Sequence, residues 1–406
     1  MAIVPIISLD KYRDIVGDMI IEGIRSEASS LSEKTVVHIN STYQGGGVAE
    51  ILNSLIILLN DVGVKTDWRV LHGDLDFFTI TKKFHNGLQG EEINLTSKKK
   101  EIYYINNVNN AIFTHINHDV VVVHDPQPLP IITCYKKRQP WIWRCHIDIS
   151  NPRRNLWDYL KMFILKYDGM IVSMDQFKEK RIPERVMPQY VIKPSIDPLN
   201  LKNKPISSST ISKYLMKAGL DEEKPIICQV SRFDKWKDPA GMVNIFRKAK
   251  EKVDCQLVLV GSMASDDPEG QEIFEELEKT VEQEKDVHLI INAPDIVINA
   301  LQRTSVAIIQ KSLKEGFAIT VSEALWKGTP VIASNVGGIP SQVLDGKNGF
   351  LLGPYDYQGF ADKIVYLIRN PMEAKKMGQF GKQHVKNNFL ITRHLLDYIR
   401  LFKSIT

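Results

Sequence analysis

Two glutamates eight positions apart frame the stretch Glu315-Gly316-Phe317-Ala318-Ile319-Thr320-Val321-Ser322-Glu323. The stretch follows the apolar run 306–310, which is typical of a buried strand, and its second half predicts a helix over 321–326. A strand, a tight turn and a helix N-terminus form an anion site, because the first helical amides lack partners and the helix dipole favours negative charge. We therefore expect an anionic ligand to bind in front of this turn.

A second stretch supplies cations. Ser231-Arg232-Phe233-Asp234-Lys235-Trp236-Lys237 follows the apolar run 225–230 and carries Arg232 and Lys237 five positions apart. An Arg fork and a mobile Lys suit phosphate oxygens, and carboxylates beside them suit sugar hydroxyls. Taken alone, these cations are typical of a surface loop, but together with the glutamate turn they predict a nucleotide-sugar site.

Composition restricts the class of protein. The chain has 406 residues, enough for two domains, and its 43% hydrophobic and 25% charged content is that of a globular protein. A net charge of +4 is too small to predict a nucleic-acid or membrane partner. There is no long apolar run and no basic-led secretory signal. Four cysteines without a CxxC motif predict reduced thiols and a cytoplasmic localisation.

Strand-like and helix-like segments alternate through both halves, which predicts two α/β domains with parallel sheets. We expect the domains at 1–195 and 196–387, with a proline-bracketed linker at 191–198 and a C-terminal helix, about 388–406, packing back on the first. The predicted strands are 35–39, 68–71, 120–123, 141–144 and 169–173 in the first half, and 225–230, 256–260, 287–291, 306–310 and 330–333 in the second.

Two further motifs lie in the first half of the chain. Gly45-Gly46-Gly47 follows the first strand and opens a predicted helix at 48–61, which favours a phosphate cradle. It is not a G-x-G-x-x-G motif and no acidic residue ends the next strand, which argues against a dehydrogenase. Asp74-Leu75-Asp76 matches an Asp-x-Asp metal signature only formally, because no donor site is predicted around it. We therefore predict no metal site.

At these residues the chain resembles the retaining glycosyltransferases of the GT-B class in family 4, which have two Rossmann-like domains facing across a cleft. A more specific resemblance, to the trehalose glycosyltransferring synthases and the retaining trehalose phosphorylases within that family, lies in five other stretches. They are His38–Thr42, Gly45–Glu50, Phe84–Gly90, Val123–Pro128 and Trp143–Asp148.

The resemblance implies roles at the matching positions. Glu315, Arg232, Lys237 and His146 would be catalytic, with His146 near the C6 hydroxyl of the donor sugar, and Glu323 would accept hydrogen bonds from the ribose. The donor sugar and diphosphate would contact Gly46, Gly47, Arg232, Lys237, Gly316, Phe317 and Ala318. Many family members have glycine where Ala318 stands, so close backbone approach is less assured there. The acceptor would contact loops carrying Gln44, His85, Asn86, Gln89, Asp125, Gln127 and Asp148.

The implied activity is reversible transfer of glucose from UDP-, ADP- or GDP-glucose to glucose, giving the α,α-1,1 linkage of trehalose. Retention would follow from front-face attack, with a donor phosphate oxygen taking the acceptor proton and closure about 191–198 excluding water. Because Arg232 and Lys237 supply positive charge, no cofactor is expected; Mg²⁺ stimulation and a homodimer are left open.

Three alternatives remain. A trehalose phosphorylase would use inorganic phosphate, although a ribose ligand such as Glu323 would be useless to it. A transferase acting on another sugar or a lipid would need an amphipathic basic helix near the site, and none is evident. A non-catalytic nucleotide-sugar sensor would not need His146 or the acceptor loops.

Overall fold

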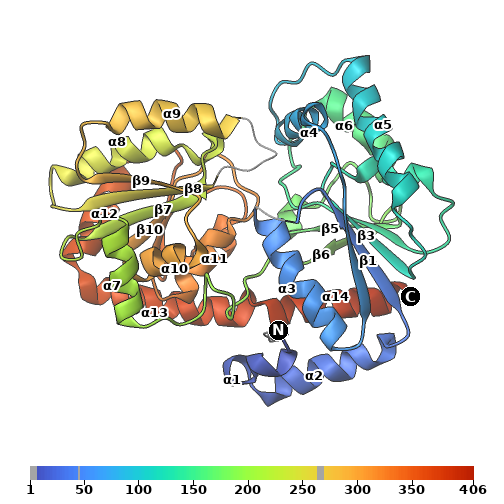
Figure 1. The fold of residues 1–406 in the computed structure, drawn as a ribbon, viewed down its shortest axis with the longest axis horizontal. Helices are drawn as coiled ribbons and strands as arrows, with labels where there is room; N and C mark the ends of the chain where they lie inside the picture. The colour runs from blue at the N-terminus through green and yellow to red at the C-terminus, as the bar shows by residue number, and fades with distance from the viewer. Residues whose placement is uncertain (1–6, 44–45, 263–268) are drawn as a thin grey trace. The chain divides into compact units, whose positions relative to one another are not determined.

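The computed structural model describes residues 7–43, 46–262 and 269–406. The chain forms two compact units (Figure 1). The first contains the described residues up to Ser195 together with Ile391–Thr406, and the second is Ile196–Leu390. Each unit is built around its own six-stranded parallel sheet.

The sheet of the first unit has the strand order β2-β1-β3-β4-β5-β6. Its central strands are buried along their whole length, as expected for a parallel sheet covered on both faces. The strands are β1 (Thr35–Asn40), β2 (Lys65–Val70), β3 (Val120–His124), β4 (Trp141–Arg144), β5 (Gly169–Val172) and β6 (Gln189–Val191).

Alternation along β1 assigns its side chains to two cores. Val37 and Ile39 belong to the large apolar core under α4 (Leu75–Leu88), α5 (Ser97–Phe113) and α6 (Arg154–Ile164). His38 faces the other way and contacts Tyr398 and Phe402. Those two residues lie on α14 (Ile391–Ile405), which packs on α3 (Gly47–Asp61) and α2 (Asp18–Ala28).

The second sheet has the order β12-β11-β10-β7-β8-β9. Strands β7 and β10 are adjacent, although they are separated by two strands and several helices in the sequence. The strands are β7 (Ile226–Arg232), β8 (Gln256–Ser262), β9 (Val287–Ile291), β10 (Ala307–Gln310), β11 (Val331–Ser334) and β12 (Gly349–Leu352).

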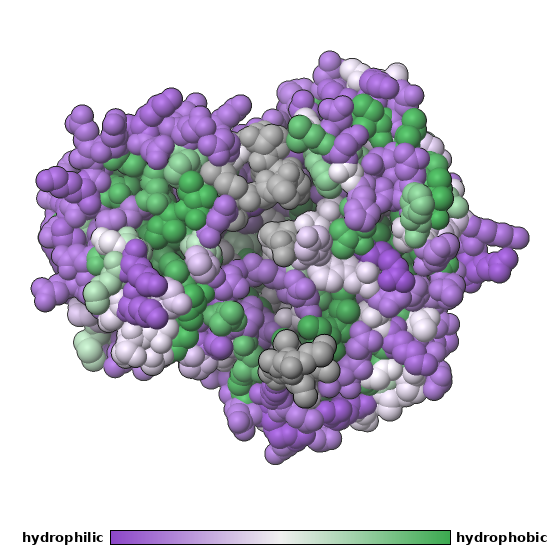
Figure 2. Space-filling view, viewed as in Figure 1, coloured by the Kyte–Doolittle hydropathy of each residue, from purple (hydrophilic) through white to green (hydrophobic). Residues whose placement is uncertain are grey.

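Helices cover both faces of this second sheet (Figure 1). On α9 (Glu269–Val281), Phe274, Leu277 and Val281 are buried at helical spacing, and the outer surface of the helix is hydrophilic (Figure 2). Helix α8 (Pro239–Lys250) packs on α12 (Tyr357–Arg369), α10 (Asp295–Thr304) on α7 (Ser208–Lys217), and α11 (Ile319–Trp326) on α13 (Pro371–Asn388).

In both sheets the strand order reverses next to the first strand, between β1 and β3 and between β7 and β10. Chain segments leaving two such strands diverge to opposite faces, so a crevice opens at the carboxyl ends of the strands. The predicted α/β class with two parallel sheets is confirmed, and the segments after β7 and β10 are placed at one crevice.

One local prediction is wrong. His85 to Leu88 form the last turn of α4 and Gln89 is its C-cap, so this segment is not a loop. Helix α5 has no counterpart among the predicted segments, because its run of lysines and asparagines obscures the apolar spacing. Of the four free thiols, Cys134 is exposed and the other three are buried. No helix within the described ranges is long and apolar enough to cross a membrane.

Candidate active site

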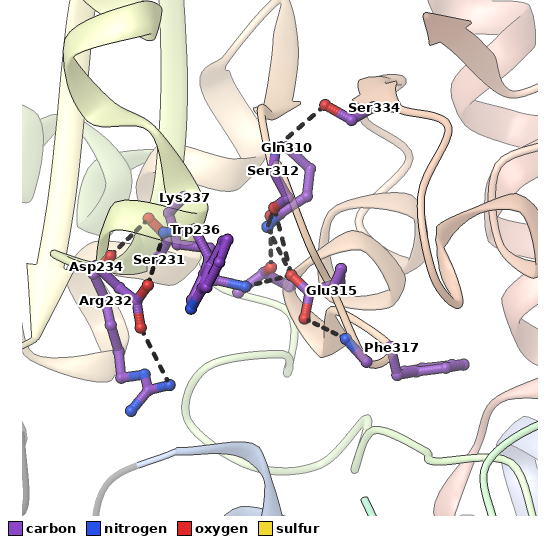
Figure 3. Close-up of polar contacts among 12 residues, drawn as sticks. Ser231, Arg232, Asp234, Trp236, Lys237, Gln310, Ser312, Glu315, Phe317 and Ser334 are labelled. Carbon is purple, nitrogen blue, oxygen red and sulfur yellow. Dashed lines mark hydrogen bonds and ion pairs between the residues drawn. The ribbon is translucent and has the colours of Figure 1, made fainter. Parts of the chain in front are cut away.

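An ion pair joins the segments that follow β7 and β10. The Lys237 ammonium contacts the Glu315 carboxylate, and both side chains are largely buried. Glu315 Oε2 also accepts hydrogen bonds from Gln310 Nε2 (3.3 Å) and Ser312 Oγ (3.4 Å), as Figure 3 shows. Its Oε1 accepts the Gly316 amide at 3.1 Å. The structure thus brings together a cation and a carboxylate that the sequence placed in separate motifs.

Arg232 lies at the end of β7, beside a carboxylate that shapes the following turn. Asp234 Oδ1 accepts the Trp236 amide at 2.7 Å and caps the short helix η5 (Lys235–Lys237). The other oxygen of Asp234 lies 3.6 Å from Arg232 Nη2 (Figure 3). About a third of the Arg232 side chain is exposed, at 33%. The guanidinium is therefore oriented by Asp234 and still reachable by a ligand.

A buried ion pair that the sequence did not reveal supports this loop. Lys311 is 0% exposed, and its ammonium contacts Asp238 Oδ2, which also accepts the Tyr357 hydroxyl at 3.1 Å. Asp238 has φ of 43° and caps α8 by accepting the Gly241 amide at 3.0 Å. Nothing in the sequence around Lys311 indicates that this lysine is buried, because a single lysine after a strand is usually exposed.

Gln229 links this ion pair to the loop that carries Lys237. Its Oε1 accepts the Lys311 amide at 3.4 Å and its Nε2 donates to the Lys237 carbonyl at 3.0 Å. Both ends of the link are backbone groups, so the link constrains where the two segments run. Lys311 and Gln229 therefore help to fix the position of Lys237.

The turn before α11 is held by an unusually close backbone approach. A Cβ on Gly337 would lie 1.7 Å from the Glu315 carbonyl oxygen, and the Gly338 amide donates to the Gly316 carbonyl at 2.9 Å. Ala318, the N-cap of α11, has φ of 66°, a conformation that costs a non-glycine residue roughly 1–2 kcal/mol. The departure from glycine at Ala318 therefore leaves the turn intact at some cost in strain.

Glu323 is buried in α11 with an unsatisfied carboxylate. The residue is 1% exposed, and neither carboxylate oxygen has a hydrogen-bond partner within the described part of the chain. The nearest recorded cation is Lys202, whose Nζ lies 3.7 Å from Oε1 and 3.9 Å from Asp295. A buried charge without hydrogen bonds is costly. The site is therefore suited to a ligand that donates two hydrogen bonds, as a vicinal diol does.

In the first unit, three histidines from neighbouring strands form a chain. His38 Nδ1 lies 2.9 Å from His124 Nε2, and His124 Nδ1 lies 2.9 Å from His146 Nε2. Burial lowers the pKa of His38 to about 3 and holds the pKa values of His124 and His146 well below the usual range. The three imidazoles are therefore neutral at neutral pH.

Asp125 lies beside this chain in a left-handed conformation, with φ of 62°. Its carboxylate accepts the His146 amide at 2.8 Å, and its carbonyl accepts Trp143 Nε1 at 3.0 Å. Burial raises the pKa of the Asp125 carboxyl to about 7, against the opposing effects of the His146 amide and the Arg144 charge. Arg144 is itself fully buried and donates to the Val172 and Ile192 carbonyls.

The end of α4 approaches the segment after β4. The Gly87 carbonyl accepts the Arg153 amide at 2.9 Å, and Gln89 Nε2 lies 3.0 Å from His85 Nδ1. Asn86 is buried, and its Oδ1 has no partner among the residues that the structure describes. This helix end therefore presents polar groups beside the 145–153 segment.

The remaining predicted residues have mostly local contacts. The Gln127 carbonyl accepts Asn107 Nδ2 at 3.1 Å, and Asp148 Oδ1 accepts the Ser150 amide at 2.9 Å. Gly46 caps α3 with φ of 86° and Gly47 is the first residue of that helix, whereas Gln44 lies outside the described residues. Asp74 Oδ1 accepts the Phe77 amide at 2.8 Å and caps α4, so its carboxylate has a structural role.

Comparison with known proteins places the chain among sugar-transferring enzymes. Residues 38–179 match the family model "Trehalose synthase, N-terminal domain", and residues 211–384 match "Glycosyl transferases group 1". The trehalose synthase of Thermococcus litoralis is 44% identical over 98% of this chain and 97% of its own length. A trehalose phosphorylase of Pleurotus pulmonarius is 29% identical, over 93% of this chain and 58% of its own length.

A solved structure shares the fold. It is described as trehalose-6-phosphate from E. coli bound with UDP-2-fluoro glucose, and it matches with a TM-score of 0.74 at 14% identity. The match covers 92% of this chain and 99% of that chain. The fold is therefore that of the GT-B glycosyltransferases.

Replacing Lys311 by Met should lower the free energy of unfolding by about 3–5 kcal/mol, because it leaves the largely buried Asp238 carboxylate without its cation. Urea unfolding measures the change. The control is Lys376→Met, which breaks the exposed pair with Glu373 and should change stability by less than about 1 kcal/mol. Equal effects of the two substitutions would contradict the structural role of the buried pair.

The raised pKa of Asp125 predicts a pH dependence of stability. Between about pH 4 and 7 the folded state keeps a proton on Asp125 that the unfolded state has lost, so the contribution of this carboxyl to stability should decline as pH rises and level off above 7. The buried neutral histidines contribute in the opposite direction, and they do so equally in the variants compared. Asp125→Asn should lack this decline, and the exposed change Asp14→Asn should retain it. Urea unfolding at several pH values measures the three curves; parallel curves for wild type and Asp125→Asn would refute the assignment.

Proposed function

The chain belongs to the trehalose synthase family of glycosyltransferases, and we propose that it transfers glucose reversibly between a nucleoside diphosphate glucose and a second glucose. The product is trehalose, with retention at the transferred anomeric carbon. The observation that carries the proposal is the buried Glu323 carboxylate, which lacks hydrogen-bond partners within the described ranges.

The nucleotide is assigned to the second unit. A ribose diol would donate two hydrogen bonds to Glu323, which is acceptor-only when ionised. The crevice at the ends of β7 and β10 is the place where nucleotides bind in open parallel sheets. The E. coli neighbour, described as bound with UDP-2-fluoro glucose, supports the choice of a nucleotide sugar.

The diphosphate is assigned to Arg232, Lys237 and the backbone before α11. A diphosphate arriving here would offer Lys237 a second anionic partner beside Glu315, and Arg232 a phosphate in addition to Asp234. Positive charge held in place before the reaction stabilises the leaving diphosphate as its charge develops. Glu315, held by several donors, would then accept hydrogen bonds from the hydroxyls of the donor sugar.

The acceptor glucose is assigned to residues of the first unit. His85, Asn86 and Gln89 at the end of α4, together with Asp125 and Gln127 after β3, supply donors and acceptors beside buried strands. We also assign Gln44 and Asp148 to the acceptor glucose, and we assign His146 to the donor sugar. In front-face attack the acceptor hydroxyl attacks the anomeric carbon directly, so no protein nucleophile is needed. A donor phosphate oxygen takes the proton of that hydroxyl, and holding the two sugars in place supplies much of the rate enhancement.

The direct test is to incubate the protein with glucose and UDP-, ADP- or GDP-glucose and to analyse the products. We expect α,α-trehalose and the matching nucleoside diphosphate, and we expect turnover to persist in EDTA because the two cations supply positive charge. A parallel sample contains trehalose and inorganic phosphate. Glucose 1-phosphate formed only in that sample would replace the proposal with a phosphorylase.

Glu323→Gln should weaken nucleoside diphosphate binding by about 1.5–3 kcal/mol, because it removes the charge that accepts the ribose hydrogen bonds. The substitution keeps the shape of a buried side chain, so the fold should be retained. Calorimetry with the preferred nucleotide measures the loss, and Glu278→Gln on the exposed face of α9 is the control. Unchanged affinity in Glu323→Gln would remove the ribose from this position.

A further inference from the structure

In the first unit, two further histidines are linked in line behind His146, although one catalytic histidine needs only a single partner to orient it. His38, His124 and His146 lie on or just after the adjacent strands β1, β3 and β4, and their rings follow one another with centroids 5.2 Å and 5.3 Å apart. The two links use both nitrogens of His124, Nδ1 of His38 and Nε2 of His146.

Counting protons leaves two arrangements. Three neutral imidazoles carry three N–H groups, and two of these groups make the two links. The third proton must lie on one of the end nitrogens, His38 Nε2 or His146 Nδ1. Because each link needs one donor and one acceptor, the choice at one end fixes the tautomer of all three rings.

The surroundings of His38 favour one arrangement. His38 is fully buried, and its Nε2 has no hydrogen-bond partner in the part of the chain that the structure describes. The ring lies edge to face with Tyr398 and Phe402. An orphaned buried N–H is rarer in proteins than an unsatisfied acceptor. His38 Nε2 therefore carries no proton, and the third proton lies on His146 Nδ1.

We propose that His38 and His124 are positioning residues that fix the His146 ring with its proton on Nδ1. His38 Nδ1–H donates to His124 Nε2, and His124 Nδ1–H donates to His146 Nε2. His146, which is partly exposed and whose backbone is held by Asp125, then presents Nδ1–H as a neutral donor to a sugar oxygen. The sugar as ligand rests on the proposed function; the proton arrangement does not.

The test begins with the unliganded protein labelled with ¹⁵N-histidine. Long-range ¹H–¹⁵N spectra report which ring nitrogen carries the proton. We expect Nδ1–H at His146 in the wild type and loss of that preference in His124→Phe, where no link holds the tautomer. A proton on Nε2 of His146 in the wild type would overturn the proposal. If glucose transfer is never observed, these spectra still decide the proton arrangement separately from the proposed function.

Kinetics test the consequence for the enzyme. His124→Phe should lower kcat/KM for the glucosyl donor about tenfold, which corresponds to losing one oriented hydrogen bond. Affinity for the bare nucleoside diphosphate should stay within about twofold, since the nucleotide is assigned elsewhere. His124→Asn, whose side-chain amide can donate in place of Nδ1, should recover much of the loss, and His115→Phe at an exposed site should change neither quantity. Unchanged kcat/KM in His124→Phe, or no recovery in His124→Asn, would contradict the positioning role.

Discussion

The contact between Lys237 and Glu315 is the interaction on which the candidate donor site depends. It joins the segments that leave β7 and β10, two strands that become neighbours only because the strand order reverses there. Without that reversal the two motifs would lie at separate places on the sheet edge. The ion pair of Lys311 and Asp238 supports this contact. Gln229 connects the same two segments by hydrogen bonds to the Lys311 amide and the Lys237 carbonyl.

In both units polar or charged side chains are buried where neighbouring strands end, but the kind of side chain differs. In the second unit the cations are already paired with carboxylates, so an anionic ligand meets a site whose side chains are held in place. In the first unit the histidines are neutral, and directional hydrogen bonds rather than charge orient His146. This difference fits the proposed division, in which the second unit stabilises a departing diphosphate and the first unit positions sugar hydroxyls.

The sequence predicted the parts of the site that are local. Apolar runs located β7 and β10, and the residues just after them gave Arg232, Lys237 and Glu315. Partners that lie far away in the sequence had no such signal: nothing near Lys311 indicates Asp238, and nothing near Glu323 indicates Lys202. The sequence predicts a loop at His85–Gln89 because its polar residues and Gly87 mask the helical pattern. In the structure the segment ends α4, and a Cβ on Gly87 would lie 2.8 Å from Leu156 Cδ2, a close approach that the sequence alone does not reveal.

A crystal structure with the preferred nucleoside diphosphate tests the central claim most directly. The account predicts that both ribose hydroxyls bind the Glu323 carboxylate and that the diphosphate lies against Arg232, Lys237 and the amides before α11. A nucleotide bound elsewhere, or an inorganic phosphate beside Glu315 with Glu323 left without a ligand, would contradict it.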